Sequence, residues 1–288
     1  MKLALGTVQF GMDYGIANRD GKVKNSEIKK ILNTSKLAGI NTLDTAISYG
    51  NSEDLLGKLG VKNWKVITKL PQVPEDCRDI KAWIRKNIFS SLKKLNTKTV
   101  EGLLLHRSGD LIENKAALWN ELKYFQKEGL IKNIGYSIYS PSELDSLFEE
   151  FKPDLIQAPY NIFDRRLKNT GWLDKLKENN VEVHARSCFL QGLLLMKPHM
   201  RPKKFKNWAK LFYLYDNWLK DTQQTPLEAC LKFVDKEKAI SKIVVGIDNN
   251  NQLNDILQAI TINTSQGAPF NIYSNDEGLI NPANWDLL

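Results

Sequence analysis

Eight short runs rich in Val, Ile and Leu recur along the 288-residue chain, separated by longer segments in which apolar residues have helical spacing. The runs cover residues 3–7, 41–45, 66–70, 100–107, 131–137, 154–160, 181–187 and 243–247. They do not alternate strictly between apolar and polar residues, which is typical of parallel strands buried on both faces. Eight strands, each followed by a helix, close most naturally into a barrel. The sequence therefore predicts an α/β fold, a (β/α)8 TIM barrel.

The segments between the runs have recognisable helix ends. An apolar stripe through Ile28 and Ile31 stops before Gly39, a residue suited to the position after a helix. The stripe that begins at Leu253 follows Asn249, which is suited to the N-cap. Further helices are predicted over residues 80–95, 115–128, 141–150, 167–179 and 226–236, and the longest irregular piece over residues 191–209.

The length of the chain suits one domain, because α/β barrels of this size do not need to split. No linker or low-complexity tract interrupts it, so we expect a single barrel domain over residues 1–288. Gly6, Thr7 and Gln9 break the apolar start, which argues against a signal peptide, and no stretch approaches the roughly 18 apolar residues of a membrane span. We expect a cytoplasmic protein without a membrane partner.

The formal net charge of +8 raises the question of nucleic acid or an acidic ligand. The densest basic run is 203–206, and most other lysines interleave with acids at helical spacing. We interpret the charge as a solvated surface, with a phosphate-bearing ligand as the alternative, and expect no nucleic-acid partner.

Cys77, Cys188 and Cys230 are widely spaced and only three histidines are present, so neither a disulfide framework nor a metal site is expected.

Polar residues stand where the second, third and fourth predicted strands end. Asp44 and Lys69 end the second and third strands, His106 the fourth, and Tyr49 lies in the loop after the second. In a barrel of this kind, reactive groups gather at the carboxyl ends of the strands. We therefore expect these four side chains to meet.

Their chemistry suits the reduction of a carbonyl group, which needs a hydride donor and an acid that protonates the oxygen. A tyrosine has an ordinary pKa near ~10, and a lysine ammonium beside it would lower that pKa. Asp44 would pair with Lys69 and hold its ammonium in place. His106 would donate a hydrogen bond to the substrate oxygen and orient the carbonyl.

In the segments that carry these residues, the chain resembles the aldo-keto reductases. The similar segments come in that family's order: Leu-Asp-Thr-Ala-Ile-Ser-Tyr-Gly at 43–50, Ile-Thr-Lys at 67–69, Leu-Leu-Leu-His-Arg at 103–107, Gly-Tyr-Ser at 135–137 and Gln-Ala-Pro-Tyr-Asn at 157–161. The match runs from the first strand to about residue 260. The resemblance implies that Tyr49 is the proton donor, that Lys69 and Asp44 tune it, and that His106 positions the substrate.

Each of these residues also has a structural interpretation. Asp44 alone suits a helix cap, Tyr49 a loop aromatic, and His106 an ordinary hydrogen-bonded histidine. Lys69 is harder to explain in this way, because lysines are rarely buried without a partner. The four together favour the catalytic interpretation.

The resemblance further implies a nicotinamide dinucleotide, NADPH or NADH, extended across the barrel mouth without a Rossmann domain. Ser137 and Gln157 would bind its carboxamide, and the segment from Ser187 to Gly192 its pyrophosphate, as at the usual phosphate site of these barrels. The expected cofactor contacts are Gly6, Thr7, Asp44, Ser137, Gln157, Arg186, Ser187, Gly192, Gly246, Asp248 and Gln252.

Three departures from the family pattern bear on this site. Ile138 stands where the family has an asparagine after Ser137. Arg186 replaces an aromatic residue that packs on the nicotinamide; its guanidinium stacks there, holds an anionic substrate or forms a salt bridge. The usual clamp for the 2′-phosphate is absent, and Asp248 would repel that phosphate or bind a free ribose hydroxyl. Unless Lys242 or a loop lysine reaches the phosphate, we expect both cofactors to bind with at most a modest preference for NADPH.

The substrate is expected to be a small-molecule carbonyl compound. The segments 6–11 and 186–194 resemble a bacterial branch of the family that is associated with surface-polysaccharide and sugar metabolism, which favours a sugar or nucleotide-sugar carbonyl. Candidates for the pocket are Tyr160, Asn161, Phe163, Arg165, Arg166, Phe189 and Trp208. The sequence is compatible with a monomer or a homo-oligomer.

Two other functions compete with reduction. A dinucleotide-binding sensor or regulatory barrel with little turnover would not need all four polar residues. A different barrel enzyme, such as a hydrolase or an aldolase with Lys69 as a Schiff-base lysine, would need that lysine in a desolvated place away from Asp44.

Overall fold

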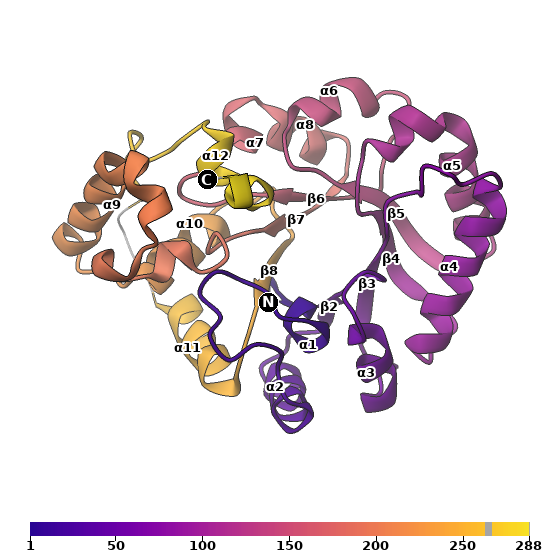
Figure 1. Cartoon of the computed structure of the whole chain (residues 1–288), viewed down its shortest axis with the longest axis horizontal. Helices are drawn as coiled ribbons and strands as arrows, with labels where there is room; N and C mark the ends of the chain where they lie inside the picture. Colours follow the sequence, from indigo (N-terminus) through magenta and orange to yellow (C-terminus); the bar gives the residue numbers. More distant parts are fainter. Residues whose placement is uncertain (263–266, 288) are drawn as a thin grey trace.

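A computed structural model describes residues 1–262 and 267–287 of the chain. Its eight strands are parallel, pair in chain order and close into a barrel when β8 pairs with β1, as predicted (Figure 1). The strands are β1 (Leu3–Gly6), β2 (Thr42–Asp44), β3 (Lys65–Leu70), β4 (Val100–Leu105), β5 (Ile131–Ser137), β6 (Leu155–Pro159), β7 (Glu182–Arg186) and β8 (Lys242–Gly246).

Helices surround the barrel and connect its strands (Figure 1). The α-helices are α1 (Val8–Gly11), α2 (Asn25–Leu37), α3 (Ser52–Leu59), α4 (Ile80–Lys94), α5 (Asp110–Lys127), α6 (Ser142–Leu147), α7 (Arg166–Asn169), α8 (Trp172–Glu178), α9 (Ala209–Asp221), α10 (Pro226–Asp235), α11 (Asn250–Thr261) and α12 (Glu277–Ile280). Short 3-10 helices are η1 (Leu193–Leu195), η2 (Pro198–Met200), η3 (Lys203–Trp208) and η4 (Pro282–Leu287).

The predicted helix ends at Gly39 and Asn249 are confirmed. Gly39 follows α2 with a φ of 80°, and the side chain of Asn249 accepts a hydrogen bond from the backbone of Gln252 at the start of α11. Four of the α-helices were not predicted: the short α1 and α12, and the longer α3 and α9. Gly57, a poor helix former, obscures the pattern of α3, whereas α9 carries a readable stripe of Phe212, Tyr215, Trp218 and Leu219.

Two predicted segments differ from the structure. The helix expected over 167–179 is divided into α7 and α8, because Gly171 between them takes a left-handed conformation that interrupts the helix. The irregular piece over 191–209 contains η1, η2 and η3.

The barrel interior is built in layers, because residues two apart on a strand point to the same side. Ile67, Leu104 and Leu155 form a small apolar cluster of their own. Space for it comes from glycines on neighbouring strands, since a Cβ on Gly102 would lie 2.8 Å from Ile67 and one on Gly135 only 1.7 Å from the Leu155 carbonyl oxygen. Two residues further along β3 and β6 stand Lys69 and Gln157, so a polar layer lies on the apolar one at the carboxyl ends of the strands.

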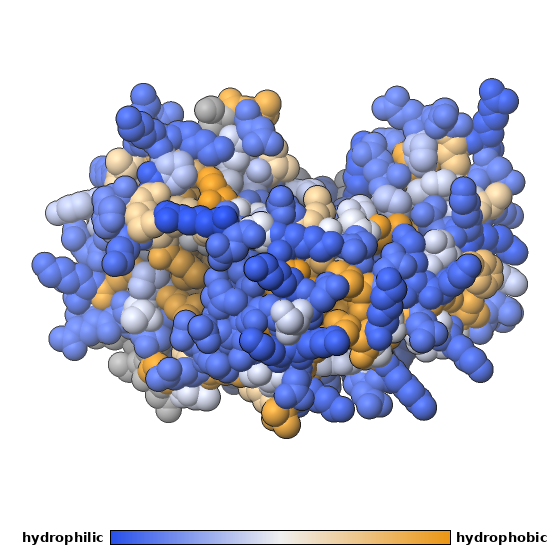
Figure 2. Space-filling model, turned by 60° about the horizontal axis from the view of Figure 1, so that its bottom comes forward, coloured by the Kyte–Doolittle hydropathy of each residue, from blue (hydrophilic) through white to orange (hydrophobic). Residues whose placement is uncertain are grey.

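The outer surface is mostly hydrophilic on the face drawn in Figure 2, where apolar residues gather in a few places between polar ones. Within residues 1–262 and 267–287, no helix has the length and apolar character needed to cross a membrane.

Candidate active site

The centre of the polar layer is a buried ion pair. Lys69 Nζ lies 2.7 Å from Asp44 Oδ1 and also donates to the Thr45 carbonyl at 2.9 Å. The other carboxylate oxygen of Asp44 accepts a hydrogen bond of 2.7 Å from Gln157 Nε2. Lys69 is only 1% exposed, so its charge depends on these contacts rather than on water. The predicted pairing of Asp44 with Lys69 is confirmed.

Tyr49 and His106 lie beside this pair. The ammonium of Lys69 is 5.2 Å from the centre of the Tyr49 ring, and the rings of Tyr49 and His106 meet edge to face with centroids 5.6 Å apart. Nδ1 of His106 is 3.1 Å from the hydroxyl of Ser48. The structure thus brings together the four residues that the sequence singled out.

The backbone around Tyr49 is held by close packing. A Cβ on Gly11 would lie 1.8 Å from the Tyr49 carbonyl oxygen, so α1 can approach this loop only with glycine at that position. Gly50 follows Tyr49 with a φ of 54°, which glycine adopts without strain. These contacts fix where the Tyr49 side chain begins.

The surroundings favour the neutral form of both rings. Burial raises the pKa of Tyr49 well above its usual value, the charge of Asp44 raises it further, and the guanidinium of Arg186 opposes them. Burial, helped by the charges of Lys69 and Arg186, lowers the pKa of His106 to about 4. Burial also lowers the pKa of Lys69, which Asp44 opposes.

The pKa of Tyr49 is raised and not lowered, contrary to the prediction from the sequence. Burial is the largest cause of the rise, and the charge of Asp44 adds to it, so the ammonium of Lys69 nearby does not bring the pKa below its usual value. The tyrosine therefore keeps its proton, as an acid requires.

A pocket of about 340 Å³ opens beside Tyr49 and Asp44. It contains almost all the expected cofactor contacts: Gly6, Thr7, Asp44, Gln157, Arg186, Ser187, Gly192, Gly246, Asp248 and Gln252. Ser137 is the exception: it is buried beside its register partner Gln157 and does not line the pocket.

Most of the suggested substrate-pocket residues lie elsewhere. Phe189 lines the pocket, but Phe163 is buried in the core, Tyr160 and Arg165 line a separate surface pocket, and Trp208 donates to Asp276. Asn161 holds its own turn by accepting from the backbone of Phe163 and Asp164. Their positions in sequence near the ends of strands could not show which way each side chain points.

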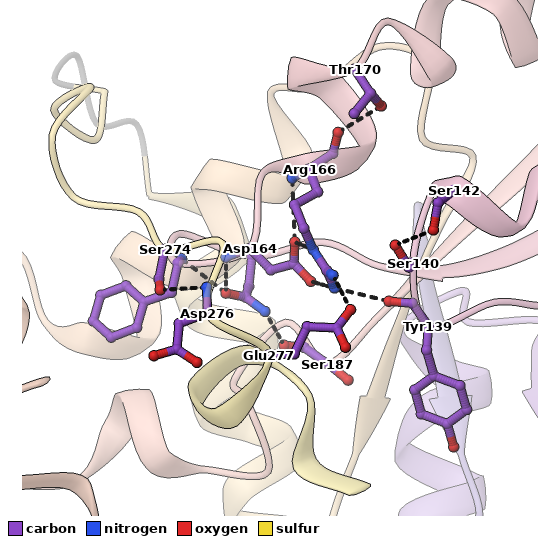
Figure 3. Close-up of polar contacts among 12 residues, drawn as sticks. Tyr139, Ser140, Ser142, Asp164, Arg166, Thr170, Ser187, Ser274, Asp276 and Glu277 are labelled. Carbon is purple, nitrogen blue, oxygen red and sulfur yellow. Dashed lines mark hydrogen bonds and ion pairs between the residues drawn. The ribbon is translucent and has the colours of Figure 1, made fainter. Parts of the chain in front are cut away.

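Arg166 is held in the network drawn in Figure 3. Its guanidinium binds Asp164 and Glu277 and donates to the Tyr139 carbonyl at 2.9 Å. Because Glu277 belongs to α12, this arginine ties the end of the chain to the loop after β6. It is therefore fully engaged within the protein.

A segment after α1, residues 12–24, also contributes to the pocket and was not anticipated. Tyr14, Gly15, Ala17 and Asn18 line it. Asn18 Nδ2 lies 3.2 Å from an oxygen of Asp248 after β8, and the Tyr14 hydroxyl lies 3.3 Å from Gln191 Nε2 after β7. We call this segment the strap, because it joins two loops that are far from it in sequence.

The loop after β7 turns its backbone toward the pocket. Leu190, Gln191 and Gly192 all have positive φ values, and a Cβ on Gly192 would lie 2.5 Å from that of Ala17 in the strap. Within the part of the chain that the structure describes, the N–H groups of Cys188, Phe189 and Gln191 donate no hydrogen bond. Successive unpaired N–H groups of this kind suit an anion such as a pyrophosphate.

The two ends of the pocket differ in charge. Among the described lining residues, Arg186 is the one cation, while Asp248 and Asp255 line the part near β8 and α11. Lys242 points elsewhere, since its ammonium contacts the Met1 carbonyl and Asn41 at the opposite end of the barrel. The suggestion that Lys242 reaches a 2′-phosphate is therefore wrong.

These residues fit a dinucleotide. Besides the free N–H groups, the pocket offers the apolar residues Leu195, Leu227, Val244 and Ile256, and a buried oxygen of Gln9 that has no hydrogen-bond donor within the described residues. Within residues 1–262 and 267–287, no group of His, Cys, Asp and Glu side chains could hold a metal ion.

The mouth of the closed barrel thus holds a buried ion pair, a tyrosine that can act as an acid, and an imidazole that favours its neutral form. This arrangement is suited to an enzyme that protonates its substrate. Residues 2–268 match the family model described as "Aldo/keto reductase family". The chain belongs to this family and is an NAD(P)H-dependent oxidoreductase that acts on small carbonyl compounds.

Relatives and solved structures agree with this assignment. The chain is 27% identical over 282 residues to the "Uncharacterized oxidoreductase YqkF" of Bacillus subtilis, with 90% of each chain covered. It is 25% identical to an "NADH-specific methylglyoxal reductase" of Escherichia coli, covering 79% of this chain and 80% of the other. The holo form of the aldo-keto reductase AKR11C1 from Bacillus halodurans has the same fold, with a TM-score of 0.72, 20% identity and coverage of 92% and 88%.

Proposed function

We propose that this chain reduces an aldehyde or ketone to an alcohol with Tyr49 as the proton donor. The observation that carries the proposal is the buried Lys69–Asp44 pair, with Lys69 Nζ 5.2 Å from the centre of the Tyr49 ring. A buried cation placed there favours the charge that a tyrosine acquires when it gives up its proton.

Each of the four residues has its own role in the proposed reaction. The hydride for the carbonyl carbon would come from a reduced nicotinamide bound in the pocket. Tyr49 gives its proton to the carbonyl oxygen, and the resulting phenolate is stabilised by Lys69 and Arg186 until solvent returns a proton. If Ser48 donates to Nδ1 of His106, the neutral imidazole carries its hydrogen on Nε2 and donates it to the substrate oxygen.

The binding of the cofactor follows from the lining of the pocket. The free N–H groups of the loop after β7 would hold the pyrophosphate. Gln157, fixed by Asp44 at 2.7 Å, would face the carboxamide from β6. The strap would cover the dinucleotide between the loops after β7 and β8.

We further propose that the chain uses NADH at least as well as NADPH. A 2′-phosphate near Asp248 and Asp255 would meet two carboxylates, and Arg186 lies at the other end with Tyr49. A carboxylate close to a phosphate dianion should cost at least about one kcal/mol, and each ~1.4 kcal/mol is tenfold in affinity. The relative named as NADH-specific supports this choice.

A sugar or nucleotide-sugar carbonyl is the substrate class that we favour. Tyr14 and Tyr139 stand near Tyr49 and Arg186, and each is about two-fifths exposed, at 43% and 40%. Exposed aromatic rings at a polar mouth suit a substrate with both apolar C–H faces and hydroxyl groups.

The proposal is tested by replacing the acid. Tyr49→Phe should lower kcat/KM for an aldehyde by about a hundredfold or more, because a positioned acid contributes about 10²–10⁴-fold, while the dissociation constant of NADH changes little. Oxidation of NADH by wild type and variant, followed with glyceraldehyde and methylglyoxal, measures the effect. Tyr213→Phe on the exposed face of α9 is the control. A Tyr49→Phe enzyme that keeps more than about a tenth of the wild-type rate would show that another group is the main acid.

A further inference from the structure

Arg186 helps to stabilise the phenolate in the proposed proton transfer, and its own contacts hold the guanidinium in one place. It ends β7, where its side chain lines the pocket with Tyr49. Its guanidinium lies 4.5 Å from the centre of the Tyr139 ring, and Nη2 donates to the Ile138 carbonyl at 2.9 Å. Its other contact is a hydrogen bond of 3.3 Å from Nη1 to the Ser187 hydroxyl.

The backbone of Tyr139, whose ring supports Arg186, is itself fixed. The N–H of Tyr139 donates to Glu143 at 2.7 Å, and its carbonyl accepts from Arg166. Figure 3 shows Arg166 held in turn by Asp164 and Glu277. The guanidinium of Arg186 is therefore preorganised, so little side-chain entropy remains to be lost when it binds a ligand.

The charge of Arg186 is not paired with a carboxylate in the part of the chain that the structure describes. Asp44, the carboxylate that lines the catalytic end of the pocket, accepts hydrogen bonds from Lys69 and Gln157. Asp164 forms an ion pair with Arg166. Of the five N–H donors of its guanidinium, two are used by residues that the structure describes. A half-buried, ordered arginine with donors to spare is suited to a carboxylate or a phosphate.

We propose that Arg186 selects carbonyl substrates that carry an anionic group, a carboxylate or a phosphate, close to the aldehyde or ketone. This inference rests on the proposed function and adds the charge of its substrate. It also bears on the sugar class, since it favours acidic or phosphorylated sugars over neutral ones. We assign the anion next to Arg186 to the substrate, because the pyrophosphate of the cofactor would be bound by the N–H groups of the loop after β7.

The test compares matched substrates. 4-Carboxybenzaldehyde and 4-nitrobenzaldehyde differ in charge but little in shape, and glyceraldehyde 3-phosphate and glyceraldehyde provide the phosphate arm. Dividing the effect of a substitution on the charged member by its effect on the neutral member cancels differences in chemical reactivity. Arg186→Leu should lower kcat/KM about ten- to a hundredfold more for the charged member of at least one pair, because charge-assisted hydrogen bonds are lost. Arg186→Lys should restore part of this loss.

The control is Arg78→Leu, which makes the same change of charge at an exposed residue outside the pocket and should leave both members unaffected. Equal losses for charged and neutral substrates overturn the inference while leaving the reductase intact. A tenfold rise in the NADH dissociation constant of Arg186→Leu, with equal losses for both substrates, would assign the anion to the cofactor instead. If wild type reduces none of the four aldehydes, the proposed function fails, and this inference fails with it.

Discussion

Lys69 is the residue that most strongly indicated a functional site at the mouth of the barrel. An ammonium that is 1% exposed costs several kcal/mol unless a partner and further acceptors replace its water. Asp44 and the Thr45 carbonyl are those partners. Because a buried lysine is so costly, its place at the end of an apolar strand was a strong signal in the sequence alone.

His106 leads to a prediction about stability and pH. Its pKa in the folded protein is about 4, below the ordinary value of ~6.5, so the unfolded chain binds more protons between these values. The stabilisation by the neutral imidazole is complete above pH ~6.5 and is lost as the pH falls toward 4. Between pH 7 and 4.5 wild type should lose about 2 kcal/mol more than His106→Gln does. Urea unfolding of both proteins at the two pH values measures this difference, and a constant difference would mean that His106 titrates normally.

At the scale of elements, the pocket is made by loops from distant parts of the chain. The strap after α1, the loop after β7 and the loop after β8 meet through the contact between Asn18 and Asp248 and through the close approach of Ala17 to Gly192. The carboxyl ends of neighbouring parallel strands meet at one end of a barrel, which brings these loops together.

Cofactor choice is a property of the loop after β8. Asp248→Arg should shift the ratio of the NADH and NADPH dissociation constants at least about tenfold toward NADPH, because a cation replaces a carboxylate near the 2′-position. Asp248→Asn keeps an acceptor for Asn18 and removes the charge, so it should have a smaller effect in the same direction. Fluorescence titrations of each protein with both reduced cofactors give the four constants. A wild-type enzyme that binds NADPH more than about tenfold tighter than NADH would overturn the proposed cofactor choice.

At the scale of the whole molecule, the barrel interior supports the site. Leu104 pairs in register with Gly135 and packs with Ile67 and Leu155, just below the layer of Lys69 and Gln157. Large side chains thus stand opposite glycines on neighbouring strands, which fills the interior without overlap. The polar layer therefore lies on a packed apolar one rather than over a void.

Removing part of this layer should weaken the whole fold. Leu104→Ala should lower the free energy of unfolding by about 2–5 kcal/mol, because Leu104 is fully buried and its neighbours cannot all move into the space. Leu37→Ala on the exposed side of α2, where the leucine is 81% exposed, should change it by less than about 0.5 kcal/mol. Urea denaturation compares the two. Equal changes in the two variants would mean that the interior cluster contributes nothing beyond surface effects.

The fold was predictable because its signal is local and repeated. Each strand is a short run of β-branched and aliphatic residues, and the number and order of eight such runs permit few arrangements. Asp44, Tyr49, Lys69 and His106 could be proposed because each lies at or just after a strand end, and a parallel barrel collects those ends. The missed helix α9 carried a comparable signal in its apolar spacing.

Other features depended on residues that only the tertiary structure brings together. The direction of Arg166, the burial of Ser137 and the place of Lys242 at the far end of the barrel follow from side-chain packing and from register between strands. The sequence by itself determined the barrel and the four residues at its mouth, since strand pattern and strand ends are properties of short segments. Whether a charge such as that of Arg186 is compensated was decided by the tertiary structure, because ion pairs depend on distances of a few ångströms between segments far apart in the chain.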